Sequence, residues 1–185
     1  MTASDDQTRL LDAAEQLFYA RGYQAVGMDE IRAASQLSLK QIYALHKGKD
    51  QLAVAMLARR DDVWHAALDA HVSKSSTPKD RVLAVFDWLA LWLSGDGYRG
   101  CAWINAFGEL GGTSAEVTKA VQQHKARFAD YLSQLATEAN LADLAPAFYL
   151  LAEGAMVTAG MQGRPDAAHA ARSAAVALMA KEEVR

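Results

Sequence analysis

The 185-residue chain is poor in several residue types, and each shortage excludes a class of protein. Its single cysteine cannot form a disulfide within the chain, which fits a reducing cytoplasm. Its three prolines leave long stretches free to form helix. No apolar run approaches the ~20 residues that span a membrane. The polar, acidic start MTASDDQTR is not that of a secretory signal.

The residues that are abundant indicate a folded helical protein. Apolar residues make up 51% of the chain and charged residues 22%, which is enough to build a core and excludes a disordered chain. Apolar positions recur with helical spacing throughout, so we expect an all-α protein of about nine helices. The net charge of −3 argues against a protein that coats nucleic acid indiscriminately.

The stretch MDEIRAASQLSLKQIYALHKGK, residues 28–49, predicts two short helices joined by a tight turn. Apolar residues recur at every third position on both sides of that turn, at Ile31, Ala34, Leu37, Ile42 and Leu45. Each helix therefore has an apolar stripe that faces a common core.

The second of these helices has the features of a helix that reads DNA. Ser38 stands at the N-cap position and Gln41 follows three residues later, which is a capping-box pattern. The helix should therefore begin at Leu39. Its outward face carries side chains that donate hydrogen bonds, as binding in a major groove requires: Lys40, Gln41, Tyr43 and His46.

Local charge agrees with this interpretation. From Arg32 to Arg60 there are six basic residues and one acid, Asp50, so the local balance is +5 in a chain of net charge −3. A basic island in an acidic protein suits phosphate contact at one place only. The pattern alone also fits a helical hairpin with a solvated basic face, because short helix-turn-helix patterns often occur by chance.

Three segments of this region resemble the tetracycline-repressor (TetR) family of bacterial transcription regulators: AAEQLFYARGY (13–23), Asp29-Glu30-Ile31 and LSLKQIYALHKGKDQL (37–52). RGCAWINAFGEL (99–110) is similar to one branch of that family. The resemblance implies a helix-turn-helix DNA-binding domain over residues 1–49. It also implies a ligand-binding and dimerisation domain over residues 50–185, entered by a long helix at about 50–71.

The resemblance also implies roles for individual residues. Lys40 and Gln41 would face base edges, and Leu39 would touch a thymine methyl group. The resemblance also implies that Ser38, Tyr43 and Lys49 bind phosphates. Phosphate contacts position the helix on the DNA but do not read its sequence. Backbone amides at the start of the preceding helix, at Gly27 and Met28, offer a further phosphate site.

The chain departs from the family pattern at three places. Val26 and Gly27 stand where relatives usually carry hydroxyl groups. Gln36 replaces the usual glycine of the turn, where the backbone prefers a left-handed conformation. His46 replaces a core phenylalanine, and either points to DNA or is a hydrogen-bonded histidine of the core.

The family implies a dimer formed by the last two helices, and small residues on both helices support it. Such faces allow close helix packing, and an isologous four-helix interface would result. The alternative is that both helices are buried within one subunit. The residues predicted at the interface are Phe148, Leu151, Ala155, Thr158, Ala167, Ala171, Ala174 and Leu178.

The family also implies an effector pocket in the carboxyl-terminal part. An aromatic lining with few polar groups suits a small, mostly apolar or aromatic ligand, although each aromatic also fits an ordinary core. The predicted aromatic, thioether and thiol groups are Trp88, Trp92, Cys101, Trp103, Phe107, Phe128, Tyr131, Tyr149 and Met156. The predicted polar groups are Asn105, Glu109, His124 and Glu153, with His124 a candidate partner for the Glu153 carboxylate.

Other chemistry has weaker support. Cys101 is either a reactive thiol that senses electrophiles or oxidants, or an inert buried thiol. Asp61, Asp62 and His65 have the one-turn spacing of a weak metal site, but a solvated helix face explains them better. No phosphate loop or nucleophile motif indicates an enzyme, and Glu109 with His124 is the sole candidate catalytic pair.

We therefore expect a cytoplasmic, homodimeric DNA-binding regulator without metal or cofactor. We expect a repressor that a small effector releases from a pseudo-palindromic operator. The alternative is a helical module that binds small molecules or proteins and retains only vestigial DNA binding.

Overall fold

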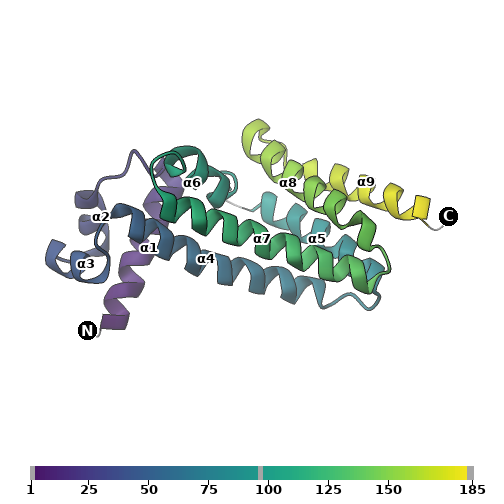
Figure 1. Cartoon of the computed structure of the whole chain (residues 1–185). Coiled ribbons are helices and arrows are strands. Elements are labelled where there is room, and N and C mark those ends of the chain that lie inside the picture. Colours follow the sequence, from purple (N-terminus) through teal and green to yellow (C-terminus); the bar gives the residue numbers. More distant parts are fainter. Residues whose placement is uncertain (1–2, 96–97, 183–185) are drawn as a thin grey trace. The chain divides into compact units, whose positions relative to one another are not determined.

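The computed structural model describes residues 3–95 and 98–182. Within these ranges the chain forms nine α-helices, one short 3-10 helix and no strand, which confirms the predicted all-α class (Figure 1). The α-helices are α1 (Ala3–Arg21), α2 (Met28–Ser35), α3 (Leu39–Leu45), α4 (Lys49–Val72), α5 (Pro78–Leu93), α6 (Ala102–Leu110), α7 (Ala115–Glu138), α8 (Ala145–Gln162) and α9 (Ala167–Glu182). The 3-10 helix η1 (Ala142–Leu144) precedes α8.

The helices form two compact units that alternate along the chain. The first unit contains residues 1–62 and 102–123, and the second contains residues 63–101 and 124–185. The predicted DNA-binding segment, residues 1–49, lies wholly within the first unit. The long helices α4 and α7 each contribute their first part to the first unit and their last part to the second.

The core of the first unit contains Leu10, Ala14 and Phe18 of α1, which follow a helical spacing and are completely or almost completely buried. Of the stripe predicted for residues 28–49, Ile31, Leu37 and Ile42 are buried, whereas Ala34 is exposed and Leu45 is half-buried. Gln36 ends α2 in the left-handed conformation, with φ of 58°. The turn therefore forms as the family pattern predicts, although a residue other than glycine in this conformation costs about 1 kcal/mol.

Ion pairs connect α4 to α1 within the first unit. The Arg59 guanidinium bonds to Asp12 at 2.7 Å and to Glu15 at 2.8 Å, and Arg60 also pairs with Glu15. The connector that follows α1 also meets α6, because the Tyr23 hydroxyl donates to the carbonyl of Ala102 at 3.3 Å. These contacts hold α1 in a fixed position, from which it packs on α2 and α3.

The core of the second unit is an aromatic cluster centred on Trp64 of α4. The Trp64 ring meets Trp88 edge-on at 4.8 Å between ring centroids, Phe128 at 5.1 Å and His124 at 5.3 Å. Trp92 stacks on Trp88 at 5.8 Å. No local sequence pattern indicates Trp64, because the rings that surround it come from two other helices, α5 and α7.

The apolar length of α8 corrects one expectation. Among the described residues, the helical segment Ala142–Gln162 is long and apolar enough to cross a membrane by length and composition, with a hydropathy of 1.3. Asp143, Glu153 and two glycines divide the segment, so it does not stand out in the sequence as one apolar run. One third of its most apolar window is buried inside the subunit.

Replacing Trp64 with alanine should destabilise the second unit by about 3–5 kcal/mol, because the indole fills the centre of the aromatic cluster. Urea unfolding followed by circular dichroism measures the loss. The adjacent Val63 is 66% exposed, so Val63→Ala is the matched control and should change stability by less than about 0.5 kcal/mol. Equal effects of the two substitutions would contradict the assignment of Trp64 as the centre of this core.

Candidate nucleic-acid interface

The predicted capping box at the start of α3 is present. Ser38 is the N-cap; its Oγ accepts a hydrogen bond from Gln41 N at 3.2 Å, and its own N–H donates to Gln41 Oε1 at 3.0 Å. The helix therefore begins at Leu39, as predicted. Ile42 is completely buried and anchors this short helix to the core.

The opposite face of α3 is exposed. Leu39 is 39% exposed and Tyr43 is 47% exposed, and Lys40 and Gln41 are also exposed. An ammonium, a carboxamide, a phenol and an isobutyl group are thus presented on one short helix. These groups can bind phosphates, base edges and thymine methyl groups.

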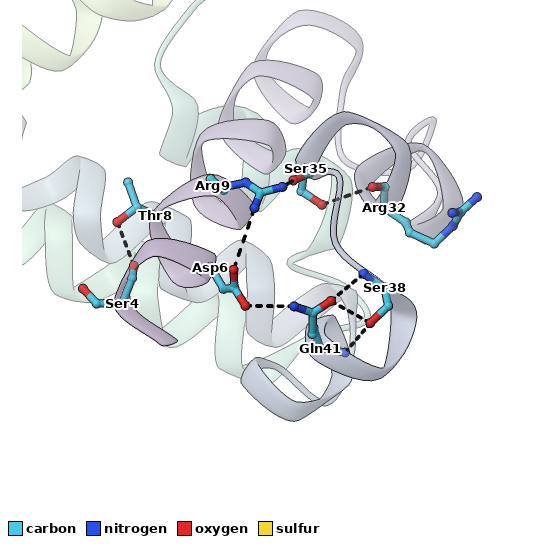
Figure 2. A network of polar contacts seen from close by, with 8 residues as sticks. All are labelled: Ser4, Asp6, Thr8, Arg9, Arg32, Ser35, Ser38 and Gln41. Carbon is cyan, nitrogen blue, oxygen red and sulfur yellow. Dashed lines mark hydrogen bonds and ion pairs between the residues drawn. The ribbon is translucent and has the colours of Figure 1, made fainter. Parts of the chain in front are cut away.

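Three residues from the first turns of α1 hold α2 and α3 in place, and Figure 2 shows two of them, Asp6 and Arg9. Gln41 Nε2 donates to Asp6 Oδ2 at 3.0 Å. Arg9 Nη2 donates to the carbonyl of Ser35, the last residue of α2, at 2.6 Å. The carboxamide of Gln7 hydrogen-bonds His46 Nε2 at the far end of α3, at 3.0–3.2 Å. No local sequence pattern predicts these three hydrogen bonds, because each joins residues 26 to 39 positions apart.

His46 takes the core position of the two that the sequence left open. Its ring is half-buried and bonded to Gln7. Burial lowers the pKa of His46 below its usual value, because water is removed from the charged form. Loss of the positive charge weakens binding to a phosphate, so this environment disfavours a phosphate contact by His46. The predicted DNA contact of His46 stays a prediction.

Lys49 is used inside the first unit. Its Nζ donates to the carbonyls of Tyr23 at 3.0 Å and Val26 at 3.2 Å. The ammonium therefore ties the α1–α2 connector to the start of α4 and has one N–H left for a phosphate. Its phosphate contact stays a prediction.

The basic island is smaller than the sequence suggests. Arg59 and Arg60 are neutralised by acids of α1, and Arg32 lies 3.6 Å from Asp29. Lys40 and Lys47 are its exposed lysines, so the basic surface is concentrated at α3.

The start of α2 also agrees with the predicted phosphate site. Gly27 is the N-cap, and its position makes no side-chain cap bond. A Cβ at Gly27 would meet nothing within 4 Å, so a hydroxyl residue would fit there without strain. No side-chain cap therefore competes with a phosphate for the backbone amides of Gly27 and Met28.

The predicted effector residues of α6 all belong to the first unit. Trp103 is 1% exposed, Asn105 is half-buried, and Phe107 points outward at 53% exposed. The Glu109 carboxylate accepts from Gln24 N at 2.9 Å, and its backbone carbonyl accepts from Gln24 Nε2 at 2.6 Å. Glu109 therefore holds the α1–α2 connector, a role that the sequence analysis did not predict.

The predicted effector residues of the second unit have different surroundings. Trp88, Trp92, His124 and Phe128 pack in the Trp64 cluster. Tyr131 instead donates to Asp69 at 3.2 Å and lines a hollow of about 290 Å³ beside Arg81 and Glu138. Burial, followed by the charge of Asp69, raises the pKa of Tyr131.

The partner of Glu153 is Lys125, and the suggested pairing with His124 is wrong. Lys125 Nζ lies 2.7 and 2.8 Å from the two Glu153 oxygens and 3.8 Å from Cys101 Sγ. Burial, then the Glu153 charge, raises the pKa of Tyr149 to about 12. Cys101 is 2% exposed and Met156 is 1% exposed.

Small residues of α8 and α9 form a shallow apolar groove of about 350 Å³. The groove is lined by Leu150, Leu151, Gly154, Ala155, Thr158, Arg164, Ala167, Ala170 and Ala171. Five of the eight predicted interface residues are among them, and Ala174 and Leu178 are half-buried on α9. Phe148 is completely buried within the subunit, so the prediction that it faces a partner is corrected.

Residues 10–56 match the family described as bacterial regulatory proteins, tetR family. A search of curated proteins finds no match. Among solved structures, the chain is similar to a TetR-family transcriptional regulator from Streptomyces coelicolor, with 28% identity, 96% of each chain covered and a TM-score of 0.87.

Two further structures share the fold. The reduced form of E. coli NemR is 22% identical, with 92% of this chain and 95% of that chain covered and a TM-score of 0.83. The regulatory protein TetR from Rhodobacter sphaeroides is 24% identical, with 91% and 95% covered and a TM-score of 0.77. The likeness extends over nearly the whole chain and not only over the amino-terminal helices.

Proposed function

We propose that the chain is a DNA-binding transcriptional regulator of the TetR kind that acts as a homodimeric, effector-controlled repressor, because residues 10–56 match that family and the whole chain is similar to a solved TetR-family regulator. It works in the cytoplasm on a pseudo-palindromic operator. The observation that carries the proposal is the exposed outer face of α3, capped by Ser38 and anchored by Ile42.

Different exposed residues of α3 contact bases and phosphates. Lys40 reads a base edge, Leu39 packs on a thymine methyl group, and Tyr43 bonds a phosphate. A rigid helix that is already in its binding conformation loses little entropy on association. Amides at the start of α2 add a second phosphate contact beside it.

Two copies of the chain associate through α8 and α9. Large apolar side chains on these helices are exposed in one subunit: Leu150 at 68%, Met161 at 83%, Val157 at 37% and Val176 at 41%. Exposure of this kind supports a covered interface, and a four-helix isologous dimer covers it with the groove at its centre. The two α3 helices then reach half-sites about one helical turn, ~34 Å, apart.

The effector acts through α4. This helix supplies residues to both units, so a ligand that repositions its second half alters the DNA-binding end without touching the reading residues. The aromatic side chains of α5 and α7 favour a small, mostly apolar or aromatic effector.

A helical binding module with vestigial DNA binding is the competing proposal. Its support is the loss of hydroxyl side chains at Val26 and Gly27 and the burial of His46, which lowers the pKa of its imidazole. A gel shift with the DNA that flanks the chain's own gene separates the two proposals, because a binding module would shift this DNA no more than a scrambled fragment.

The DNA-binding assignment predicts different losses for two substitutions on α3. Lys40→Ala should remove discrimination at one base pair, worth about 1–3 kcal/mol, because it removes a base contact. Tyr43→Phe should weaken binding evenly across sequences, because it removes a phosphate contact. Binding to a randomised operator library measures both effects. An even loss for Lys40→Ala would show that Lys40 binds phosphate and does not read bases.

The interface assignment predicts that Gly154→Leu breaks the dimer. A Cβ at Gly154 meets nothing within 4 Å in one subunit, so the leucine fits the subunit but fills the groove that a partner would enter. Sedimentation should show monomers, with at least a tenfold loss of operator affinity. Gly108→Leu on α6 is the matched control, since a Cβ there also meets nothing within 4 Å. A dimeric Gly154→Leu protein would place the interface elsewhere.

A thiol sensor is a second candidate function, favoured by the Lys125 ammonium 3.8 Å from Cys101 Sγ. Because the thiol is 2% exposed, we expect N-ethylmaleimide to modify the native protein at least tenfold more slowly than the urea-unfolded protein. Intact mass measures the rates. Fast modification with loss of operator binding, absent in Cys101→Ser, would favour the sensor instead.

A further inference from the structure

The carboxamide of Gln41 is occupied by the protein at both ends. Its Oε1 accepts from Ser38 N at 3.0 Å and from Ser38 Oγ at 2.8 Å, and its Nε2 donates to Asp6 Oδ2 at 3.0 Å. Figure 2 shows the side chain lying between these two residues, with Asp6 on α1 and Ser38 at the start of α3. A residue that lies on the presumed reading face is therefore tied to two segments of its own chain.

The hydrogen-bonding capacity of a carboxamide limits what Gln41 can still do. The oxygen accepts two hydrogen bonds and the nitrogen donates two. Both acceptor positions and one donor are used by Ser38 and Asp6, which leaves one N–H. The bidentate contact with adenine needs one donor and one acceptor together, so Gln41 held in this way cannot make it.

Asp6 is well placed to hold the amide. Its side chain is 15% exposed, and Arg9 Nη1 lies 3.8 Å from its other oxygen, Oδ1. Arg9 is fixed in turn by its bond to the Ser35 carbonyl. The carboxylate is thus set by α1 against the start of α3.

We propose that Asp6 is a specificity-determining residue that acts through Gln41. It fixes the carboxamide so that α3 offers the DNA one N–H donor, and no acceptor, at this position. A single donor can bind N7 of either purine, whereas the bidentate contact that singles out adenine is blocked, so the operator should not distinguish adenine from guanine at the base pair that faces Gln41. The inference rests on the proposed function and adds to it the class of sequence that this position selects.

Removing Asp6 should change that selection. In Asp6→Ala the amide nitrogen loses its anchor, and the remaining bonds to Ser38 are exposed to water and weak enough to exchange for a base contact. The freed carboxamide can then present a donor and an acceptor together. We expect the preference for adenine over guanine at that base pair to rise about fivefold or more.

The experiment is selection from a randomised operator library with the full-length protein and four variants, each first checked for an unchanged thermal unfolding midpoint. Gln41→Ala identifies the base pair, as the one whose purine preference disappears. Asp6→Asn keeps an acceptor oxygen but loses the charge, and should retain the wild-type profile. Asp5→Ala is the matched control, because Asp5 is an exposed acid in the same helical turn; it should change affinity and salt dependence without changing the profile.

Three results overturn the inference while the proposed function stands. The first is that the wild type prefers adenine alone, with Gln41→Ala removing that preference. The second is that Asp6→Ala selects the same sequences as the wild type, and the third is that Asp6→Asn selects the same sequences as Asp6→Ala. The last result would assign the effect to charge and not to the hydrogen bond. If the wild type enriches no sequence, the proposed function fails and the inference fails with it. A purine-degenerate wild type that turns toward adenine only in Asp6→Ala supports it.

Discussion

The attachment of α3 to α1 is the constraint on which the DNA-binding surface depends. A helix of seven residues is not stable by itself in water, so its position must come from the rest of the unit. Ile42 supplies the apolar part of the attachment, and Asp6 and Gln7 supply polar contacts at its two ends. The capping box only closes the first turn; the packing on α1 decides where that turn lies.

The same attachment explains why exposed residues of α3 are not equivalent. Leu39, Lys40 and Tyr43 project from the helix and are available to DNA. Gln41 is also exposed, but its amide oxygen and one of its two N–H groups are already used within the protein. Exposure therefore identifies the surface, and the hydrogen-bond partners identify which residues on that surface can read bases.

The second unit follows a different principle. Its interior is filled by aromatic side chains around Trp64, whereas α8 and α9 retain exposed apolar residues and a groove of small ones. A subunit that buries its large aromatics and leaves small and aliphatic residues outside is suited to a close helix–helix contact. This arrangement also explains why α8 has the composition of a membrane-spanning helix. Leu150, Val157 and Met161 give α8 an exposed apolar face in addition to its buried one, and both faces raise its hydropathy.

Residues close together in the chain were enough to predict the helical class, the capped start of α3 and the left-handed turn at Gln36, because each of these features depends on residues within a few positions of one another. Other features became known only from the packing of the helices: His46 bonds to Gln7, and Lys49 binds backbone carbonyls. Likewise, Glu153 pairs with Lys125, and Phe148 faces the interior. These contacts join residues 23 to 39 positions apart, or depend on which face of a helix is covered. Local spacing carries a helix's period and its caps, but the partner of a polar side chain is set by how the helices pack.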